Sequence, residues 1–359
     1  MDTLNPSRMT DSIGSAGVLL INFGEPETTS LDEVVPFLER IFTANSRLEP
    51  GSNPESVRSR SRMLAQQRAP DLARSYARIG GSPLNAQALE QARMLSAELA
   101  SRGVETPVEV GMQFTEPTIE DAITRLRRHD PNKLAVLPVY PLCGPSTTVA
   151  SLTSVTTIIE NLGWEPEILE VTGWHRHPDY HLLRARTTQN AAQAAGLDLN
   201  AESDRLLFSA HGTPMRYVRE GSRYVEYVEE WCATQGRALG VHNWNLGYQN
   251  HSNRRVEWTR PSIEEALQNL NGVKNVLVDP VSFMHEQSET LMELDIDLRD
   301  EAAALGIQLH RVPVPHDNEA FSSVLADLVL MALGQEVRGI HTLTQCKCRP
   351  GAAVCFNGA

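Results

Sequence analysis

Apolar segments of strand length recur along the chain, and segments with helical spacing of apolar residues lie between them. The short apolar runs predict strands at 17–23, 108–114, 133–141, 165–173, 204–211, 244–249, 275–283 and 307–315. Helical periodicity predicts helices at 84–102, 117–128, 178–196, 217–239, 287–305 and 319–333. Strand and helix alternation on this scale is typical of parallel sheets covered by helices on both faces. We therefore predict an α/β fold, and the length of 359 residues indicates two doubly wound domains rather than one.

The region 45–75 differs from the rest of the chain. It is polar, rich in arginine and serine, and interrupted by prolines. These features predict short helices in a lid or flap beside a cleft.

Composition narrows the class of protein. With 41% hydrophobic and 21% charged residues, the chain is typical of soluble globular proteins. A net charge of −13 argues against nucleic acid as a partner and is compatible with attracting cations. No apolar run approaches the roughly 18 residues of a membrane span, and residues 1–12 lack the apolar segment of a signal peptide. We expect a cytoplasmic protein with at most peripheral membrane contact.

His211 ends the apolar run 206–210 and is followed by Gly212 and Pro214, which stop the strand. In open α/β sheets, ligands bind outside the carboxyl ends of strands, so we expect this histidine to lie at a ligand-binding position. A neutral imidazole accepts a proton near pH 7 or binds a divalent metal. The alternative is a strand-end histidine satisfied by backbone groups.

An acidic series follows the predicted strand 275–283. If 287–305 is helical, carboxylates recur every four residues along one face, at Glu289, Glu293, Asp297 and Glu301. Such a row weakens a helix by roughly a few tenths of a kcal/mol per pair. It also binds or passes along a hard divalent cation such as hydrated Fe²⁺. The alternative is a solvated acidic helix face.

Two turns are candidates for ligand contact. The turn Gly80-Gly81-Ser82-Pro83-Leu84 opens onto a helix, where backbone N–H groups can bind an anion. It has neither Rossmann nor Walker spacing, and on its own it is better explained as a structural turn. In the turn 22–26, Phe23 either presents a ring to a flat apolar ligand or belongs to the core, and its place in the chain does not decide between them.

Three of the five cysteines, Cys346, Cys348 and Cys355, lie close together near the end of the sequence. In a reducing compartment such a cluster is more typical of a metal site than of disulfides. A fourth thiolate would complete a site for an iron–sulfur cluster or zinc, and Cys143 and Cys232 compete for that position. The alternative is a tail with free thiols.

Together these motifs resemble the ferrochelatase family, whose members insert ferrous iron into a porphyrin. The resemblance runs in order from about Gly17 to Leu333. It rests on the turn 22–26, Arg68-Ala69-Pro70, Tyr76, the segment 79–84, Gly111-Met112-Gln113-Phe114, the segment 209–214, Tyr248-Gln249, Glu257-Trp258, Pro261, and Glu289-Thr290-Leu291 with Glu293-Leu294-Asp295. No single motif is decisive, but the ordered set is highly specific.

The resemblance implies two Rossmann-like domains with a porphyrin cleft between them. The expected division has a flexible N-terminus at 1–12, a first domain at 13–141 and 318–345 with a lip at about 45–75, a second domain at 142–317 that carries His211 and Glu289, and a cysteine-rich tail at 346–359.

The resemblance also implies roles for the candidate residues. His211 is similar to the histidine that takes up pyrrole protons or binds incoming iron, and Glu289 is similar to its acidic partner across the cleft. Glu293 and Asp297 continue the acidic face. Because two pyrrole protons leave and Fe²⁺ sheds water as it enters a dianionic ring, a base and carboxylates suit the chemistry. The implied porphyrin contacts are Phe23, Ser82, Gln249 and Trp258.

The sequence departs from the family pattern in two places. The family commonly has a histidine two residues before the glutamate of Glu-Thr-Leu, where this chain has Gln287. A glutamine cannot relay protons, so either that histidine is dispensable or nearby His285 substitutes. The run 249–255 also differs from the family's usual Gln-Ser-Arg and glycine-containing sequence. These changes bear on rate and substrate rather than on fold.

Some ferrochelatases carry a [2Fe–2S] cluster on C-terminal cysteines and one mid-chain cysteine, and this chain resembles that subset. Cys143 matches the mid-chain position better than Cys232 does. The implied cluster ligands are therefore Cys143, Cys346, Cys348 and Cys355. We expect a structural role for the cluster, because iron insertion changes no oxidation state.

The substrate stays open between coproporphyrin III and protoporphyrin IX. Arg58, Arg60 and Arg62 in the lip are available to propionates, which favours the ring with four propionates. Two other functions are considered: a cobalt or nickel chelatase acting on a sirohydrochlorin-like ring, and a porphyrin or metal carrier without turnover. The cobalt and nickel enzymes usually carry more histidines at the metal site, and Gln287 points away from them.

Overall fold

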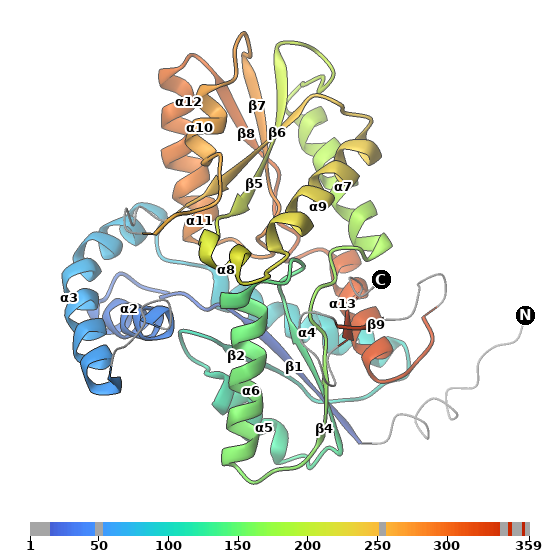
Figure 1. Cartoon of the computed structure of the whole chain (residues 1–359). Coiled ribbons are helices and arrows are strands. Elements are labelled where there is room, and N and C mark those ends of the chain that lie inside the picture. The colour runs from blue at the N-terminus through green and yellow to red at the C-terminus, as the bar shows by residue number, and fades with distance from the viewer. Residues whose placement is uncertain (1–14, 47–52, 251–255, 338–343, 347–353, 356–359) are drawn as a thin grey trace, which may run out of the picture.

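The computed structural model describes residues 15–46, 53–250, 256–337, 344–346 and 354–355. In this part of the chain the strands form two four-stranded parallel sheets and one antiparallel hairpin. Figure 1 shows the two sheets one above the other, each with helices around it. The predicted α/β class with parallel sheets is confirmed.

The two sheets have the same strand order. The first has the order β2-β1-β3-β4 and contains β1 (Ala16–Asn22), β2 (Val108–Met112), β3 (Lys133–Pro138) and β4 (Glu167–Glu170). The second has the order β6-β5-β7-β8 and contains β5 (Asp204–His211), β6 (Trp244–Gln249), β7 (Asn275–Pro280) and β8 (Gln308–Arg311). The strand order reverses beside β1 and beside β5, so in each sheet a ligand is expected at the carboxyl end of these strands.

Helices connect the strands. Before β5 the chain forms α2 (Leu31–Asn45), α3 (Pro54–Ile79), α4 (Leu84–Ser101), α5 (Ile119–Arg127), the π-helical turn η2 (Pro145–Val149), α6 (Ala150–Asn161) and α7 (Pro178–Ala194). After β5 it forms α8 (Met215–Arg219), α9 (Tyr224–Leu239), α10 (Ile263–Gln268), α11 (Ser288–Leu291), the π-helical turn η3 (Glu293–Leu298), α12 (Arg299–Ala304) and α13 (Glu319–Ala332). The tail hairpin pairs β9 (Thr344–Gln345) with β10 (Val354–Cys355).

Each of the predicted strands coincides with an observed strand. The reason is visible in β1, in which every residue is buried. Strands covered by helices on both faces appear in a sequence as continuous apolar runs, and such runs are easy to find. The predicted helix 217–239 is in fact two helices, α8 and α9, with Gly221 at a φ of 98° in the break between them.

The region 45–75 is where the prediction was wrong. Residues 54–79 form one helix of 26 residues, α3, instead of several short ones. It begins at the cap residue Asn53, contains Pro70, and ends at Gly80 with a φ of 79°. A buried stripe on this helix packs on α2, and it consists of Ala65, Ala69 and Tyr76. The many arginines around this narrow stripe hide its helical spacing in the sequence.

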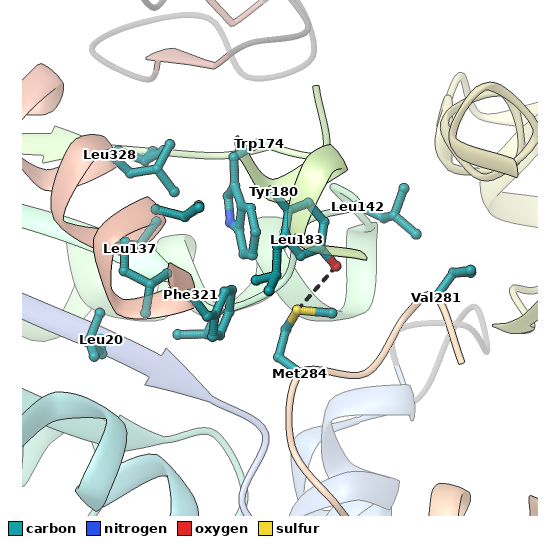
Figure 2. Packing of buried hydrophobic residues seen from close by; sticks show 14 of the residues in the cluster. Leu20, Leu137, Leu142, Trp174, Tyr180, Leu183, Val281, Met284, Phe321 and Leu328 are labelled. Carbon is teal, nitrogen blue, oxygen red and sulfur yellow. Dashed lines mark hydrogen bonds between the residues drawn. The ribbon is translucent and has the colours of Figure 1, made fainter. Parts of the chain in front are cut away.

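The largest hydrophobic cluster contains residues of both halves of the molecule and joins them (Figure 2). Trp174 packs edge-on against Tyr180 with ring centroids 5.0 Å apart, and Phe321 of α13 lies 6.0 Å from Trp174. Leu20 of β1 belongs to the same cluster, and Met284, which follows β7, accepts the Tyr180 hydroxyl at 3.3 Å. Since each such side chain contributes about 1.5–3 kcal/mol when buried, this core holds the halves in one arrangement.

The chain crosses from the first sheet to the second between β4 and β5. β4 pairs with β3, although the expected division assigns residues after 141 to the second domain. If the boundary is drawn by sheet membership, it falls after β4. The sequence did not indicate this position, because an apolar run predicts a strand without showing which sheet the strand joins. α13 packs on α4 and β3 of the first half. The full division into domains stays a prediction.

Candidate active site

The strand that carries His211 lies inside the second sheet. β5 pairs with β6 on one side and β7 on the other, and its register places His211 opposite Gln249. Glycine is required at 212, because a Cβ there would lie 2.9 Å from the carbonyl oxygen of Gln249. Pro214 then forms an isolated bridge with Trp258. His211, Gln249 and Trp258 thus come together at the carboxyl end of this sheet.

His211 and Glu289 form a close pair. Nδ1 of His211 lies 2.7 Å from Oε1 of Glu289. The backbone N–H of His211 donates to the Ser282 hydroxyl at 3.0 Å, and the Tyr224 hydroxyl donates to the His211 carbonyl at 3.0 Å. Burial acts to lower the pKa of His211, but the Glu289 carboxylate outweighs it, and the net pKa is raised. The carboxylate therefore makes His211 a stronger base than an isolated histidine.

Gln287 binds the other carboxylate oxygen of Glu289. Its Nε2 donates to Oε2 of Glu289 at 2.7 Å. At the position of the family's usual histidine, the glutamine thus orients Glu289 without being able to carry a proton. Burial, together with nearby His316, lowers the pKa of His285 to about 3, which argues against His285 as a substitute base.

Glu293 lies beside this pair in the π-helical turn η3. Nε2 of Gln249 donates to Oε2 of Glu293 at 2.9 Å and to the carbonyl of Glu289 at 2.8 Å. Burial, followed by the charge of Glu289, raises the pKa of Glu293 to about 8. Burial thus favours the protonated form of Glu293, whereas Glu289 lies against the imidazole of His211.

The outer members of the acidic row lie toward solvent. The segment 287–305 is not one regular helix, since Asp297 donates to the Met292 carbonyl in the five-residue spacing of a π-helix. Asp297 pairs with Arg78 of α3 at 3.2 Å, and both side chains are about half exposed. Glu301 is exposed on α12. The row therefore runs from the partly buried Glu289 to the surface. π turns of this kind are frequent at functional sites.

Glu25 is a buried carboxylate at the site that sequence reasoning missed. Glu25 is only 3% exposed, and its carboxyl group accepts hydrogen bonds from the Ser288 N–H, at 2.9 Å, and from the Ser288 hydroxyl. Burial raises its pKa, and the hydrogen bonds from Ser288 oppose that effect. The available signal was its place in the turn 22–26 after a buried strand. Because 263 residues separate Glu25 from its partner, no local pattern reveals the contact.

Two of the predicted porphyrin contacts lie in the first half, near Glu25. Phe23 packs against Phe114 with ring centroids 4.7 Å apart and is partly buried. Ser82 is buried, its N–H donates to the Pro26 carbonyl at 3.3 Å, and its hydroxyl accepts from Leu84 N–H at 3.3 Å. The structure therefore places Phe23 and Ser82 on one half, and Gln249 and Trp258 on the other.

Three of the four predicted cluster ligands, Cys143, Cys346 and Cys355, belong to the described residues. Cys346 and Cys355 are buried together in the tail hairpin, and the Thr172 hydroxyl donates to Sγ of Cys346 at 3.4 Å. Cys143 is also buried and follows β3. Cys348 lies outside the described residues. Within the residues that the structure describes, no group of three or more His, Cys, Asp and Glu side chains is arranged to hold a metal ion.

Comparison with known proteins settles the family. The sequence matches the Ferrochelatase family over residues 15–333. The chain belongs to the ferrochelatase family. It is 33% identical over 353 residues to the ferrochelatase of Trichodesmium erythraeum (strain IMS101), which covers 92% of this chain and 86% of that protein. It is 32% identical to the ferrochelatase of Gloeobacter violaceus, with 90% of this chain and 99% of that protein covered.

The fold of this ferrochelatase is similar to that of solved chelatases. SirB from Bacillus subtilis with Fe³⁺ has a TM-score of 0.53 at 12% identity, covering 89% of this chain and 98% of that one. The sirohydrochlorin chelatase SirB from Bacillus subtilis subspecies spizizenii in complex with cobalt has a TM-score of 0.51 at 10% identity, covering 89% and 96%. At these identities the likeness shows the fold alone.

Family membership makes the chain an enzyme, a lyase that inserts metal into a porphyrin, as the resemblance implied. Among the described residues, no helix combines the length and apolar character needed to cross a membrane.

Proposed function

We propose that this ferrochelatase inserts ferrous iron into a porphyrin beside the carboxyl end of β5, with His211 as the proton acceptor and Glu289 as its acidic partner. The contact of 2.7 Å between Nδ1 of His211 and Oε1 of Glu289 carries the proposal. Iron insertion releases two protons from the ring as Fe²⁺ takes their place. The site therefore has to accept protons and attract a dication, and a base strengthened by a carboxylate meets both needs.

Glu293 and Asp297 extend this role toward the surface in our proposal. Asp297 is partly exposed and offers hard oxygen ligands to a hydrated ferrous ion. Glu293 lies between Asp297 and Glu289 in the sequence of the row, and a cation beside it favours release of its proton. Fe²⁺ would then be handed along the row from Asp297 to Glu293 and on to His211 and Glu289.

We propose coproporphyrin III as the substrate, because arginines on α3 suit a ring with a propionate on every pyrrole. Arg58, Arg60 and Arg62 are exposed on this helix. At the rise of an α-helix, Arg62 stands about 24 Å along α3 from Arg78, the residue that pairs with Asp297. The support for this substrate is chemical, because a guanidinium group pairs in a bidentate way with a carboxylate such as a propionate.

The experiment is an anaerobic assay of Fe²⁺ insertion with coproporphyrin III and protoporphyrin IX side by side. We expect both to be metallated and kcat/KM to be about tenfold higher for coproporphyrin III, which corresponds to about 1.4 kcal/mol of transition-state binding. A preference for protoporphyrin IX would contradict the substrate assignment. If neither ring were metallated, iron insertion itself would be wrong.

We also propose that the tail binds a [2Fe–2S] cluster through Cys143, Cys346, Cys348 and Cys355. Two observations support this proposal. Cys346 and Cys355 are buried together, and Thr172 donates a hydrogen bond to Cys346. Thr172 follows β4, Cys143 follows β3, and these two strands are neighbours in the first sheet. Four thiolates are the usual ligands of such a cluster. When bound, the cluster would tie the tail hairpin to the first half of the molecule.

The spectrum of the purified protein tests this assignment. We expect visible absorption of a [2Fe–2S] cluster with equimolar iron and sulfide, lost in Cys346→Ser and in Cys355→Ser. Cys232→Ser is the matched control, because Cys232 is buried inside α9 on the second half and should leave the spectrum unchanged. A colourless protein that contains zinc would contradict the cluster.

A further inference from the structure

Glu25 is a carboxylate in a place where a charge is costly. The residue is 3% exposed, and burial of an ionised carboxyl costs several kcal/mol unless strong hydrogen bonds offset it. Ser288 donates two hydrogen bonds to this carboxyl group, one from its N–H at 2.9 Å and one from its hydroxyl. A carboxylate of the first half of the molecule therefore holds a residue of the second half.

The backbone of Glu25 is fixed on the first half. Its N–H donates to Oδ1 of Asn85 at 3.1 Å, and Nδ2 of Asn85 donates to its carbonyl at 3.0 Å. The preceding Gly24 adopts a φ of 78°, and a Cβ there would lie 2.7 Å from Cβ of Met112. Glu25 is thus anchored to both α4 and the first sheet, and it has little freedom to follow movements of Ser288.

Ser288 lies directly before Glu289 in the chain. On the other side of Ser288, Gln287 donates to Glu289. Glu289 in turn pairs with His211 at the end of β5. The chain of contacts therefore runs from Asn85 through Glu25 and Ser288 to the carboxylate that meets the proton acceptor.

We infer that Glu25 is a positioning residue for iron insertion, which holds Glu289 in place across the two halves by way of Ser288. The inference rests on the proposed role of His211 and Glu289. Glu25 touches neither reacting atom and acts through hydrogen bonds, so its removal lowers kcat through misplacement of Glu289 and leaves porphyrin affinity unchanged. A displacement of about 1 Å at such a site is worth up to about 100-fold in rate.

Two substitutions at position 25 separate hydrogen bonding from charge. Glu25→Gln retains an acceptor for the Ser288 N–H and a donor for the Ser288 hydroxyl, so kcat should stay within about threefold of the unchanged protein. Glu25→Ala loses both contacts, and kcat should fall about tenfold or more while the porphyrin Kd, measured by fluorescence, changes less than about twofold. Rescue by glutamine is the sign of positioning.

Ser288→Ala tests the path of the effect. It removes only the hydroxyl contact, so its loss of kcat should be smaller than that of Glu25→Ala, about threefold. If both residues act through the same contact, the double variant should be no slower than Glu25→Ala alone. Should Glu25→Ala fail to fold, the threefold loss in Ser288→Ala at unchanged porphyrin Kd carries the test.

A matched control is Asp327→Ala. Asp327 is also a buried carboxyl, and it joins α13 to Arg102, the residue that directly follows α4. Its replacement should lower the melting temperature and leave kcat unchanged. Three results would overturn the inference and leave the proposed function standing. Glu25→Ala could keep full kcat, the double variant could lose kcat by the product of the two single losses, or only the porphyrin Kd could change. If the unchanged protein metallates no porphyrin, the proposed function fails and the inference with it.

Discussion

At the scale of residues, the surroundings of each carboxyl group decide its role. Glu289 lies 2.7 Å from the imidazole of His211, whereas burial raises the pKa of Glu293 to about 8. The sequence singled out His211 and Glu289 because both follow the ends of apolar strands, and the structure brings the two side chains into contact, while their roles stay a prediction. It did not predict Glu25, because that role depends on a contact with the distant Ser288.

The raised pKa of Glu293 predicts how stability depends on pH. The folded protein binds this proton more tightly than the unfolded chain, whose pKa is near 4.5, so stability is lost as pH rises from 4.5 through about 8. Glu293→Gln removes this cost and keeps an acceptor for Gln249. We expect the variant to be more stable than the unchanged protein at pH 8.5, by on the order of a few kcal/mol, with little difference at pH 4.5.

Urea unfolding at the two pH values measures this difference. Glu301→Gln is the control, because Glu301 belongs to the same acidic row but is exposed on α12, so its effect should be small at both pH values. A difference for Glu293→Gln that does not change with pH would show that Glu293 ionises normally.

At the scale of elements, predictions from the sequence worked for strands and failed for exposed helices. Buried parallel strands appear as apolar runs, and every predicted strand is present. α3 was interpreted as short helices, because most of its surface is polar and its buried stripe is narrow. The π turn η3 was also beyond prediction, since its geometry depends on contacts with β8.

Arg311 at the end of β8 binds a carboxylate of η3. Its guanidinium binds both oxygens of Asp295, at 2.9 and 2.8 Å, and Glu286 at 3.1 Å. The Arg311 side chain is only 10% exposed, so Arg311→Met leaves two carboxylates without this partner in a partly buried place. We expect the free energy of unfolding to fall by about 3–5 kcal/mol, and iron insertion to slow as Glu289 and Glu293 lose their support.

Arg299→Met is the matched comparison. Arg299 also pairs with Asp295, at 3.4 Å, but its side chain is half exposed, and such a pair contributes at most about 1 kcal/mol. Denaturant midpoints of the two variants provide the measurement. Equal, small effects of both changes would show that η3 does not depend on Arg311.

At the scale of the whole molecule, two sheets of the same order share one core and together build the site. The sequence predicted the two α/β halves but not how they meet. Trp174 and Phe321 lie on connecting segments, and an apolar pattern does not reveal which faces will pack on one another. That packing brings Glu25 of one half against Ser288 of the other, which is the contact on which the inferred role of Glu25 depends.

The most direct test of the account compares His211→Ala with the unchanged protein in anaerobic Fe²⁺ insertion, with porphyrin binding measured separately. The control is His242→Ala, which changes an exposed histidine before β6. The account predicts that His211→Ala loses about 100-fold or more in the rate of iron insertion but still binds porphyrin, whereas His242→Ala keeps the rate of the unchanged protein. Iron insertion by His211→Ala at the rate of the unchanged protein would contradict it.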